Sequence, residues 1–71
     1  MEIKVKARFN ASNERVETYG RNMYIMYFPF EEDAESESII AGCLSRATGT
    51  PQKRIFFKAK DPMGNWIFEL S

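Results

Sequence analysis

The side chains that most often carry out catalysis or hold metal ions are almost absent from this sequence. It contains no histidine and a single cysteine, Cys43. Histidine is the commonest general acid or base and the commonest metal ligand, so both roles lack their usual residue. With no histidine to activate it, Cys43 is expected to be a small core residue. No phosphate-binding glycine loop or paired-cysteine motif occurs. The sequence therefore predicts a protein that is not an enzyme and has no cofactor.

One acidic block precedes the predicted helix, and its composition raises the question of a calcium site. Its members are Glu31, Glu32, Asp33, Glu35 and Glu37. Calcium prefers several carboxylate oxygens, but an EF-hand loop also needs a glycine and a distal glutamate in register, and residues 33–38 have neither. Acidic residues at a helix start interact favourably with the helix dipole, by about 0.3 to 1 kcal/mol each. We therefore expect no metal here.

Basic and aromatic side chains alternate along the predicted strands and would share the sheet face opposite the helix. Such faces bind single-stranded nucleic acid, because aromatic rings stack on bases and cations contact phosphates. The candidate residues are Lys4, Lys6, Tyr24, Arg54, Phe56, Lys58 and Lys60. A formal net charge of zero and an isoelectric point near 6.2 argue against this reading.

The apolar side chains predicted for the same outer face support a protein interface instead. Tyr24, Met26, Phe56 and Ile67 would form a larger apolar patch than small monomers usually expose. The sequence therefore favours a small interaction module that binds a protein partner, or forms a homodimer, through the outer sheet face. Binding of single-stranded RNA through the basic and aromatic residues is the alternative.

Length and composition indicate one small folded domain that comprises residues 1–71. Hydrophobic residues make up 44% of the chain and aromatic residues 14%, which is typical of a globule with its own core. No apolar stretch approaches the length that spans a bilayer, and the first residues enter a strand pattern without a signal-like segment. We expect a cytoplasmic protein without membrane contact. A lone cysteine excludes an intramolecular disulfide.

Alternation of apolar and polar residues predicts strands in the first 28 residues. The segment 3–9 alternates apolar with basic side chains. A hairpin is predicted from strands 15–19 and 23–28, and a two-residue loop between them places Val16 and Thr18 on the same face as Met23 and Ile25. Tyr24 and Met26 then point to the opposite face, which is the outer face of the predicted interface.

A helix is predicted over residues 34–48 because apolar side chains recur there at helical spacing. Its apolar stripe consists of Ile40, Cys43, Leu44 and Ala47. Asp33 is the expected N-cap, and Gly49 followed by Pro51 ends the helix.

The last hairpin, residues 54–70, surrounds the turn signal Asp61-Pro62-Met63-Gly64 and allows two registers. A three-residue turn with left-handed Gly64 pairs Asp61 with Asn65 but puts charges among the apolar side chains. A four-residue loop pairs Lys60 with Asn65 and keeps residues 55, 57 and 59 on the same face as 66, 68 and 70. We predict the second register, because a slip by one residue inverts every side chain. It buries Trp66 beside Phe57, Phe68 and Leu44.

These elements predict an α+β fold with two layers, in which one main helix packs on a four- to five-stranded, mostly antiparallel sheet in the order β-β-β-α-β-β. The segment 10–13 between the first two strands is rich in turn-forming residues. The two strands could therefore also form one bent strand.

The chain resembles the YggU-like small α/β proteins, a family whose biochemical role is not established. The resemblance rests on the opening strand, on the helix ending Leu44-Ser45-Arg46-Ala47-Thr48-Gly49-Thr50-Pro51, and on the strand pair 54–70. It implies the same fold. Where that family has a Gly-Lys-Ala-Asn stretch at the helix start, this chain has Ala34-Glu35-Ser36-Glu37. The anion-binding role that a lysine there would suggest is therefore not carried over.

Overall fold

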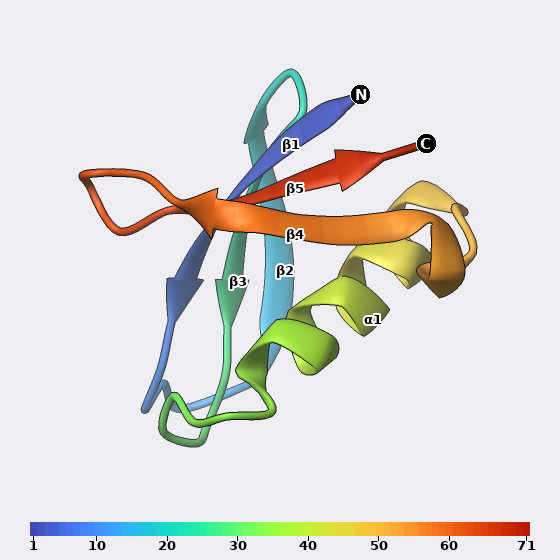
Figure 1. The fold of residues 1–71 in the computed structure, drawn as a ribbon. Coiled ribbons are helices and arrows are strands. Elements are labelled where there is room, and N and C mark those ends of the chain that lie inside the picture. Colours follow the sequence, from blue (N-terminus) through green and yellow to red (C-terminus); the bar gives the residue numbers. More distant parts are fainter.

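Five strands and one α-helix make up the protein, for which a computed structural model describes residues 1–71. The elements are β1 (Glu2–Arg8), β2 (Arg15–Gly20), β3 (Met23–Tyr27), α1 (Ser36–Thr48), a short 3₁₀ turn (Gln52–Arg54), β4 (Ile55–Lys60) and β5 (Trp66–Leu70). The strands lie in the order β2-β3-β1-β5-β4, and α1 packs on one face of the sheet (Figure 1). The predicted two-layer α+β fold is confirmed, with five strands.

The middle of the sheet contains its one parallel pair, β1 with β3, while the other three pairs are antiparallel. After β1 the chain crosses the end of β3, so β2 forms on the far side of β3. The backbone N–H groups of Asn10 and Ala11 donate to the carbonyl oxygens of Phe30 and Phe28, both at 2.9 Å. Because these bonds hold the crossing segment, β1 and β2 are separate strands and not one bent strand.

The helix begins later than predicted and ends as predicted. Its regular part starts at Ser36, and Glu35 occupies the N-cap position without a side-chain hydrogen bond. Asp33 still supports this turn: its carboxylate accepts the Glu35 N–H at 2.8 Å, and the Ser36 hydroxyl accepts the Asp33 N–H at 2.9 Å. Gly49 ends the helix in the left-handed conformation, with φ of 76°. No helix has the length and apolarity that a membrane span requires.

The β4–β5 hairpin combines features of both registers that the sequence allows. Its turn is the tight one, with Gly64 left-handed at φ of 83° and the Asp61 N–H bonded to the Asn65 carbonyl at 2.9 Å. The ladder nevertheless pairs Phe57 with Phe68, as in the predicted register, because a bulge at Lys58 takes up the extra residue. The predicted pairing of Lys60 with Asn65 is therefore wrong, since Lys60 pairs with Trp66.

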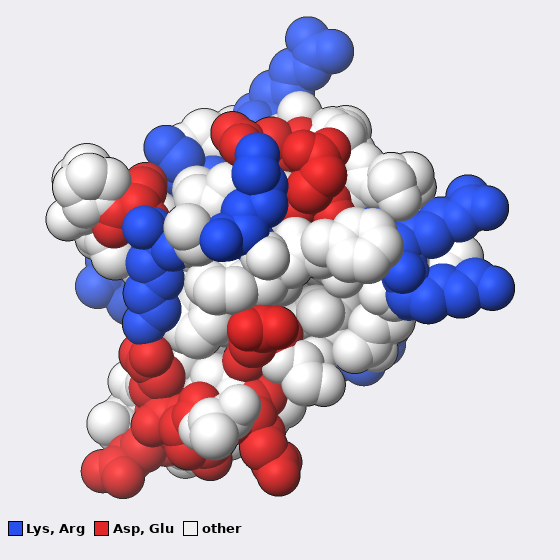
Figure 2. Space-filling model, in the orientation of Figure 1, with Lys and Arg blue, Asp and Glu red and all other residues white.

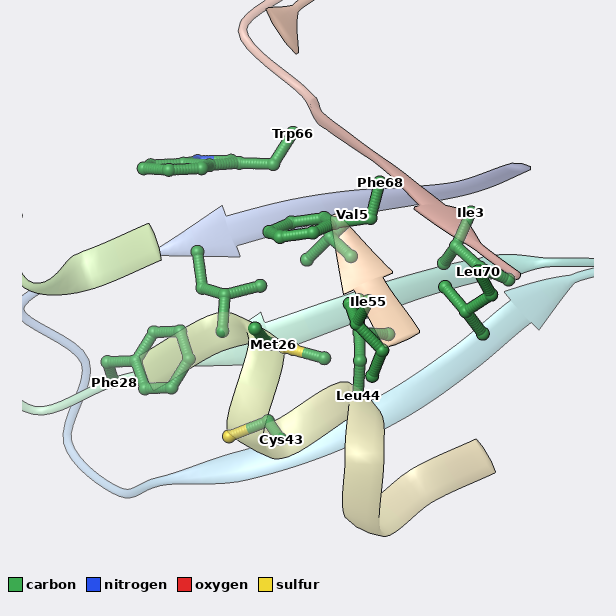
Figure 3. Close-up of a cluster of buried hydrophobic side chains, with 12 residues drawn as sticks. Ile3, Val5, Met26, Phe28, Cys43, Leu44, Ile55, Trp66, Phe68 and Leu70 are labelled. Atoms are coloured by element: carbon green, nitrogen blue, oxygen red, sulfur yellow. The ribbon is translucent and has the colours of Figure 1, made fainter. Parts of the chain in front are cut away.

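The core lies between α1 and the sheet face that it covers (Figure 3). Trp66 is 6% exposed, and its ring centroid lies 5.3 Å from that of Phe57. The Phe57 ring also meets Phe68 edge to face at 5.5 Å. Leu44 is fully buried in the same core. The predicted burial of Trp66 and its contact with Phe57 are confirmed.

Candidate functional site

The sheet face opposite α1 carries no second layer, and we call it the open face. The registers of the sheet fix which side chains share it. Lys4 of β1 pairs with Met23 of β3 on one side and with Ile67 of β5 on the other, so these three form a row across the open face. Lys6 pairs with Ile25 in the next row. Met23, Ile25 and Ile67 are half-buried, although no helix covers them.

Two residues predicted for this face lie on the other one. Tyr24 pairs with Val5, and Met26 pairs with Ala7, so both point toward α1. Met26 is fully buried, and Tyr24 packs against the core. The cause is a bulge between Thr18 and Gly20, which adds one residue to β2 and inverts the predicted hairpin register. The prediction that Tyr24 and Met26 face outward is wrong.

The other predicted interface residues, Phe56 and Ile67, lie on the open face. Phe56 pairs with Glu69 at the β4 edge and is 53% exposed. The sequence reasoning missed three residues that the β2 bulge turns to this face, namely Met23, Ile25 and Tyr27. A bulge leaves no trace in apolar periodicity, but the spacing of Met26 and Phe28, both large and apolar, indicates which side of β3 is buried.

Carboxylates neutralise several of the predicted nucleic-acid contacts. Lys4 Nζ lies 3.7 Å from Asp61 Oδ2. Lys58 Nζ lies 3.1 Å from Glu2 Oε2 and 3.9 Å from Glu69 Oε1. The basic residues on the open face therefore form a mixed surface with acids around them.

The remaining members of the predicted nucleic-acid set are dispersed. Lys60 pairs with Trp66 on the helix side, where its Nζ lies 4.4 Å from the Trp66 ring centroid and 2.6 Å from Glu32 Oε2. Arg54 belongs to the 3₁₀ turn before β4 and makes no ion pair. Lys6 lies on the open face, as predicted, and also makes no ion pair. The structure thus brings together only Lys4, Lys6, Phe56 and Lys58 of the seven residues.

A basic and aromatic row lies at the end of the open face where β1, β3 and β2 adjoin. Tyr27 pairs with Arg8 on one side and with Arg15 on the other. The Arg15 guanidinium carbon lies 4.1 Å from the Tyr27 ring centroid, and its Nε lies 3.0 Å from Glu17 Oε2. Arg8 makes no ion pair. Tyr27 is the one aromatic ring of the open face with an arginine on each side.

Charge on the helix side of the molecule is separated along α1 (Figure 2). Asp and Glu gather over the loop after β3 and the start of α1, and Lys and Arg lie near the chain between α1 and β4. This arrangement complements the helix dipole, as expected for the acidic block. No group of three His, Cys, Asp or Glu side chains is placed to hold a metal ion.

Cys43 lies in the core and borders a cleft that Arg15 and Val16 at the start of β2 also line. It is 3% exposed, and burial raises the pKa of its thiol, because the charged thiolate loses hydration there. Arg46 Nη2 lies 3.3 Å from the sulfur and opposes that shift. A thiol held in its neutral form is a poor nucleophile.

Comparison with known proteins gives no relative for this arrangement. No family model, curated protein or solved structure matches the chain. The resemblance to the YggU-like proteins stays an expectation drawn from the quoted residues.

Proposed function

We propose that this protein is a small interaction module without catalytic activity, and that it binds a protein partner through the open face. The observation that carries the proposal is a sheet with one helix on one face and nothing on the other. Half-buried apolar side chains from two strands, Met23 and Ile25 of β3 and Ile67 of β5, lie on that open face on either side of β1. Apolar side chains that an uncovered sheet face leaves partly accessible commonly mark a site of association.

The charges on the open face indicate the character of the partner. Lys6 and Arg8 follow Lys4 at every second position along β1, so all three lie on the open face beside the side chains of β3. Neither Lys6 nor Arg8 makes an ion pair. A partner with apolar side chains and carboxylates at their border would satisfy both features. Complementary charge at the border of an interface mainly sets specificity and the association rate.

A second candidate is single-stranded nucleic acid, and one observation favours it. Tyr27 lies between Arg8 and Arg15 on the open face, so an aromatic ring and two cations occupy one row. A base could stack on such a ring while cations contact phosphates. The ion pairs of Lys4, Lys58 and Lys60 weigh against this candidate, because those lysines are already neutralised.

A matched pair of variants tests the protein interface. Phe56→Ala with Ile67→Ala removes apolar surface from the open face, and Met63→Ala removes an 83% exposed apolar side chain from the β4–β5 turn. Partners captured by the immobilised protein from lysate of its own cells should be lost with the first variant and kept with the second. If both variants still capture the same partners, the open face is not the binding surface.

Titration with fluorescent single-stranded RNA at two salt concentrations separates the second candidate. Binding in the micromolar range that weakens steeply with salt would assign the open face to nucleic acid. In that case Lys6→Ala and Arg8→Ala should each lower the slope of log affinity against log salt by about one. Absence of salt-dependent binding would exclude this candidate.

A further inference from the structure

We propose that a second copy of this chain pairs with strand β2, so that two sheets join into one continuous sheet with the segment 14–18 antiparallel to itself and centred on Val16. This surface is the edge of the sheet, not the open face, so it goes beyond the function proposed above.

The two edges of the sheet differ in how well they resist such pairing. β2 is an edge strand, and all six of its residues are exposed. Unpaired backbone groups on an edge strand are a template for another strand unless charges or bulges block them. The other edge, β4, is blocked: it carries a bulge at Lys58 and cations at Lys58 and Lys60, with no acid of its own. β2 carries one cation, Arg15, and one anion, Glu17.

Symmetry limits how β2 can pair with itself. Antiparallel pairing of identical strands in one sheet requires a two-fold axis perpendicular to the sheet, which keeps both helices on the same side. Two residues opposite each other must then lie on the same face of the joined sheet. The two-fold axis therefore passes between one residue and its own copy, and we call this residue the centre of the pairing. The candidate centres are Arg15, Val16, Glu17 and Thr18.

Charge and the β2 bulge select one of these four centres. A centre on Arg15 or Glu17 sets that residue opposite its own copy, which places like charges together. A centre on Glu17 or Thr18 also carries the pairing into the bulge between Thr18 and Gly20. A centre on Val16 pairs residues 14–18, avoids the bulge, and sets Arg15 of each copy opposite Glu17 of the other.

The surroundings of Val16 fit an apolar contact at that centre. Val16 pairs with Met26, so it points to the helix side, and it is 41% exposed because α1 does not reach over β2. A cleft of about 300 Å³ lies between β2 and the second half of α1. Its walls include Val16, Cys43 and Ala47. In the proposed dimer, Val16 of the second copy lies against Val16 at the mouth of this cleft.

Charge reversal tests the proposal, because Arg15 and Glu17 are both exposed, and an exposed ion pair like the one between them adds little to stability. We expect the protein to form a reversible dimer in sedimentation equilibrium below about 1 mM. Arg15→Glu alone, or Glu17→Arg alone, sets like charges opposite each other and should weaken dimerisation about tenfold or more. The double variant, with both reversals in one chain, should dimerise like the original protein.

Mixing the single variants gives the sharpest outcome. One carries two acids on β2 and the other two cations, so an equimolar mixture should form a heterodimer although neither variant dimerises well alone. A strict monomer up to about 1 mM, or a dimer that single reversals leave unchanged, would overturn the proposal. A mixture that forms no heterodimer would overturn it as well.

Oxidative cross-linking tests the register separately. In a Cys43→Ala background, Val16→Cys should form a disulfide-linked dimer, because opposite residues of an antiparallel pair lie about 4.5 to 5.5 Å apart between Cα atoms. Thr18→Cys is the matched control, since Thr18 lies opposite Glu14 and about 13 Å along the strand from its own copy. Cross-linking through position 18 and not 16 would overturn the proposed register.

Discussion

Replacing Phe68 by alanine tests the core packing that holds the open face in place. Phe68 is fully buried at the centre of β5, and its ring meets Phe57 edge to face with centroids 5.5 Å apart. Truncation of a buried phenylalanine costs about 3 to 5 kcal/mol, which includes the cavity that it leaves. A domain of 71 residues has a free energy of unfolding of about 4 to 11 kcal/mol, at roughly 0.05 to 0.15 kcal/mol per residue. The variant should therefore lose about a third of its stability at least, and all of it if the domain lies at the low end of that range.

Urea denaturation followed by the fluorescence of the single tryptophan, Trp66, measures this loss. With a slope near 1 kcal/mol/M for a small domain, the midpoint should fall by about 3 M or more, or no folded baseline should remain. Phe56→Ala is the matched control, because it makes the same chemical change on the open face at a position that is 53% exposed. Its cost should stay below about 1.5 kcal/mol. Equal midpoint shifts for the two variants would show that β5 does not bury Phe68 as described.

Two further predictions concern the β4–β5 hairpin. Deletion of Lys58 removes the bulge residue and leaves a regular ladder, so the free energy of unfolding from urea denaturation should fall by less than about 2 kcal/mol. Deletion of Phe56 turns Ile55 to the open face and should lower it by about 2 to 5 kcal/mol. A larger loss for the Lys58 deletion than for the Phe56 deletion would refute the bulge. Backbone and side-chain hydrogen bonds from Asn65 hold the pKa of Asp61 below its ordinary value of 3.8. The contribution of the Asp61 carboxylate to the free energy of unfolding should therefore be fully present above pH 3.8 and be lost as the pH falls through the lowered pKa. Asp61→Asn should flatten this acid dependence of the urea midpoint, and an unchanged slope would contradict the assignment.

Apolar periodicity and turn chemistry predicted α1 and the segments that form the five strands, but two bulges escaped them. At the last hairpin, the glycine turn and the burial pattern demanded registers that differ by one residue. Because of the bulge at Lys58, the hairpin follows the burial register from Ile55 to Phe57 and the tight-turn register at Ala59 and Lys60. The two registers were predicted as alternatives, but the hairpin contains both. At the β2–β3 hairpin the bulge after Thr18 inverted the assignment of Tyr24 and Met26.

The candidate site was predicted less well than the fold, for a related reason. Which residues share a face depends on strand pairing between distant segments, and local patterns do not encode the parallel pairing of β1 with β3. Phe56 and Ile67 were placed on the open face because their hairpin is local. Arg8 could not be grouped with Arg15 and Tyr27, since β1 adjoins the β2–β3 hairpin only through this pairing.

The position of β1 in the sheet governs the order in which the protein can fold during synthesis. β1 leaves the ribosome before the other four strands, yet one of its two neighbours is β5, the last strand in chain order. Until β5 arrives, one side of β1 has no hydrogen-bonding partner, and Ile3 and Val5 lack the strand that completes their side of the core. Contacts between residues so far apart in sequence form slowly, because a long loop must close first. The nascent chain therefore has to stay soluble with an incomplete sheet, and its basic β1 residues Lys4, Lys6 and Arg8 keep that exposed strand charged until synthesis of β5 is complete.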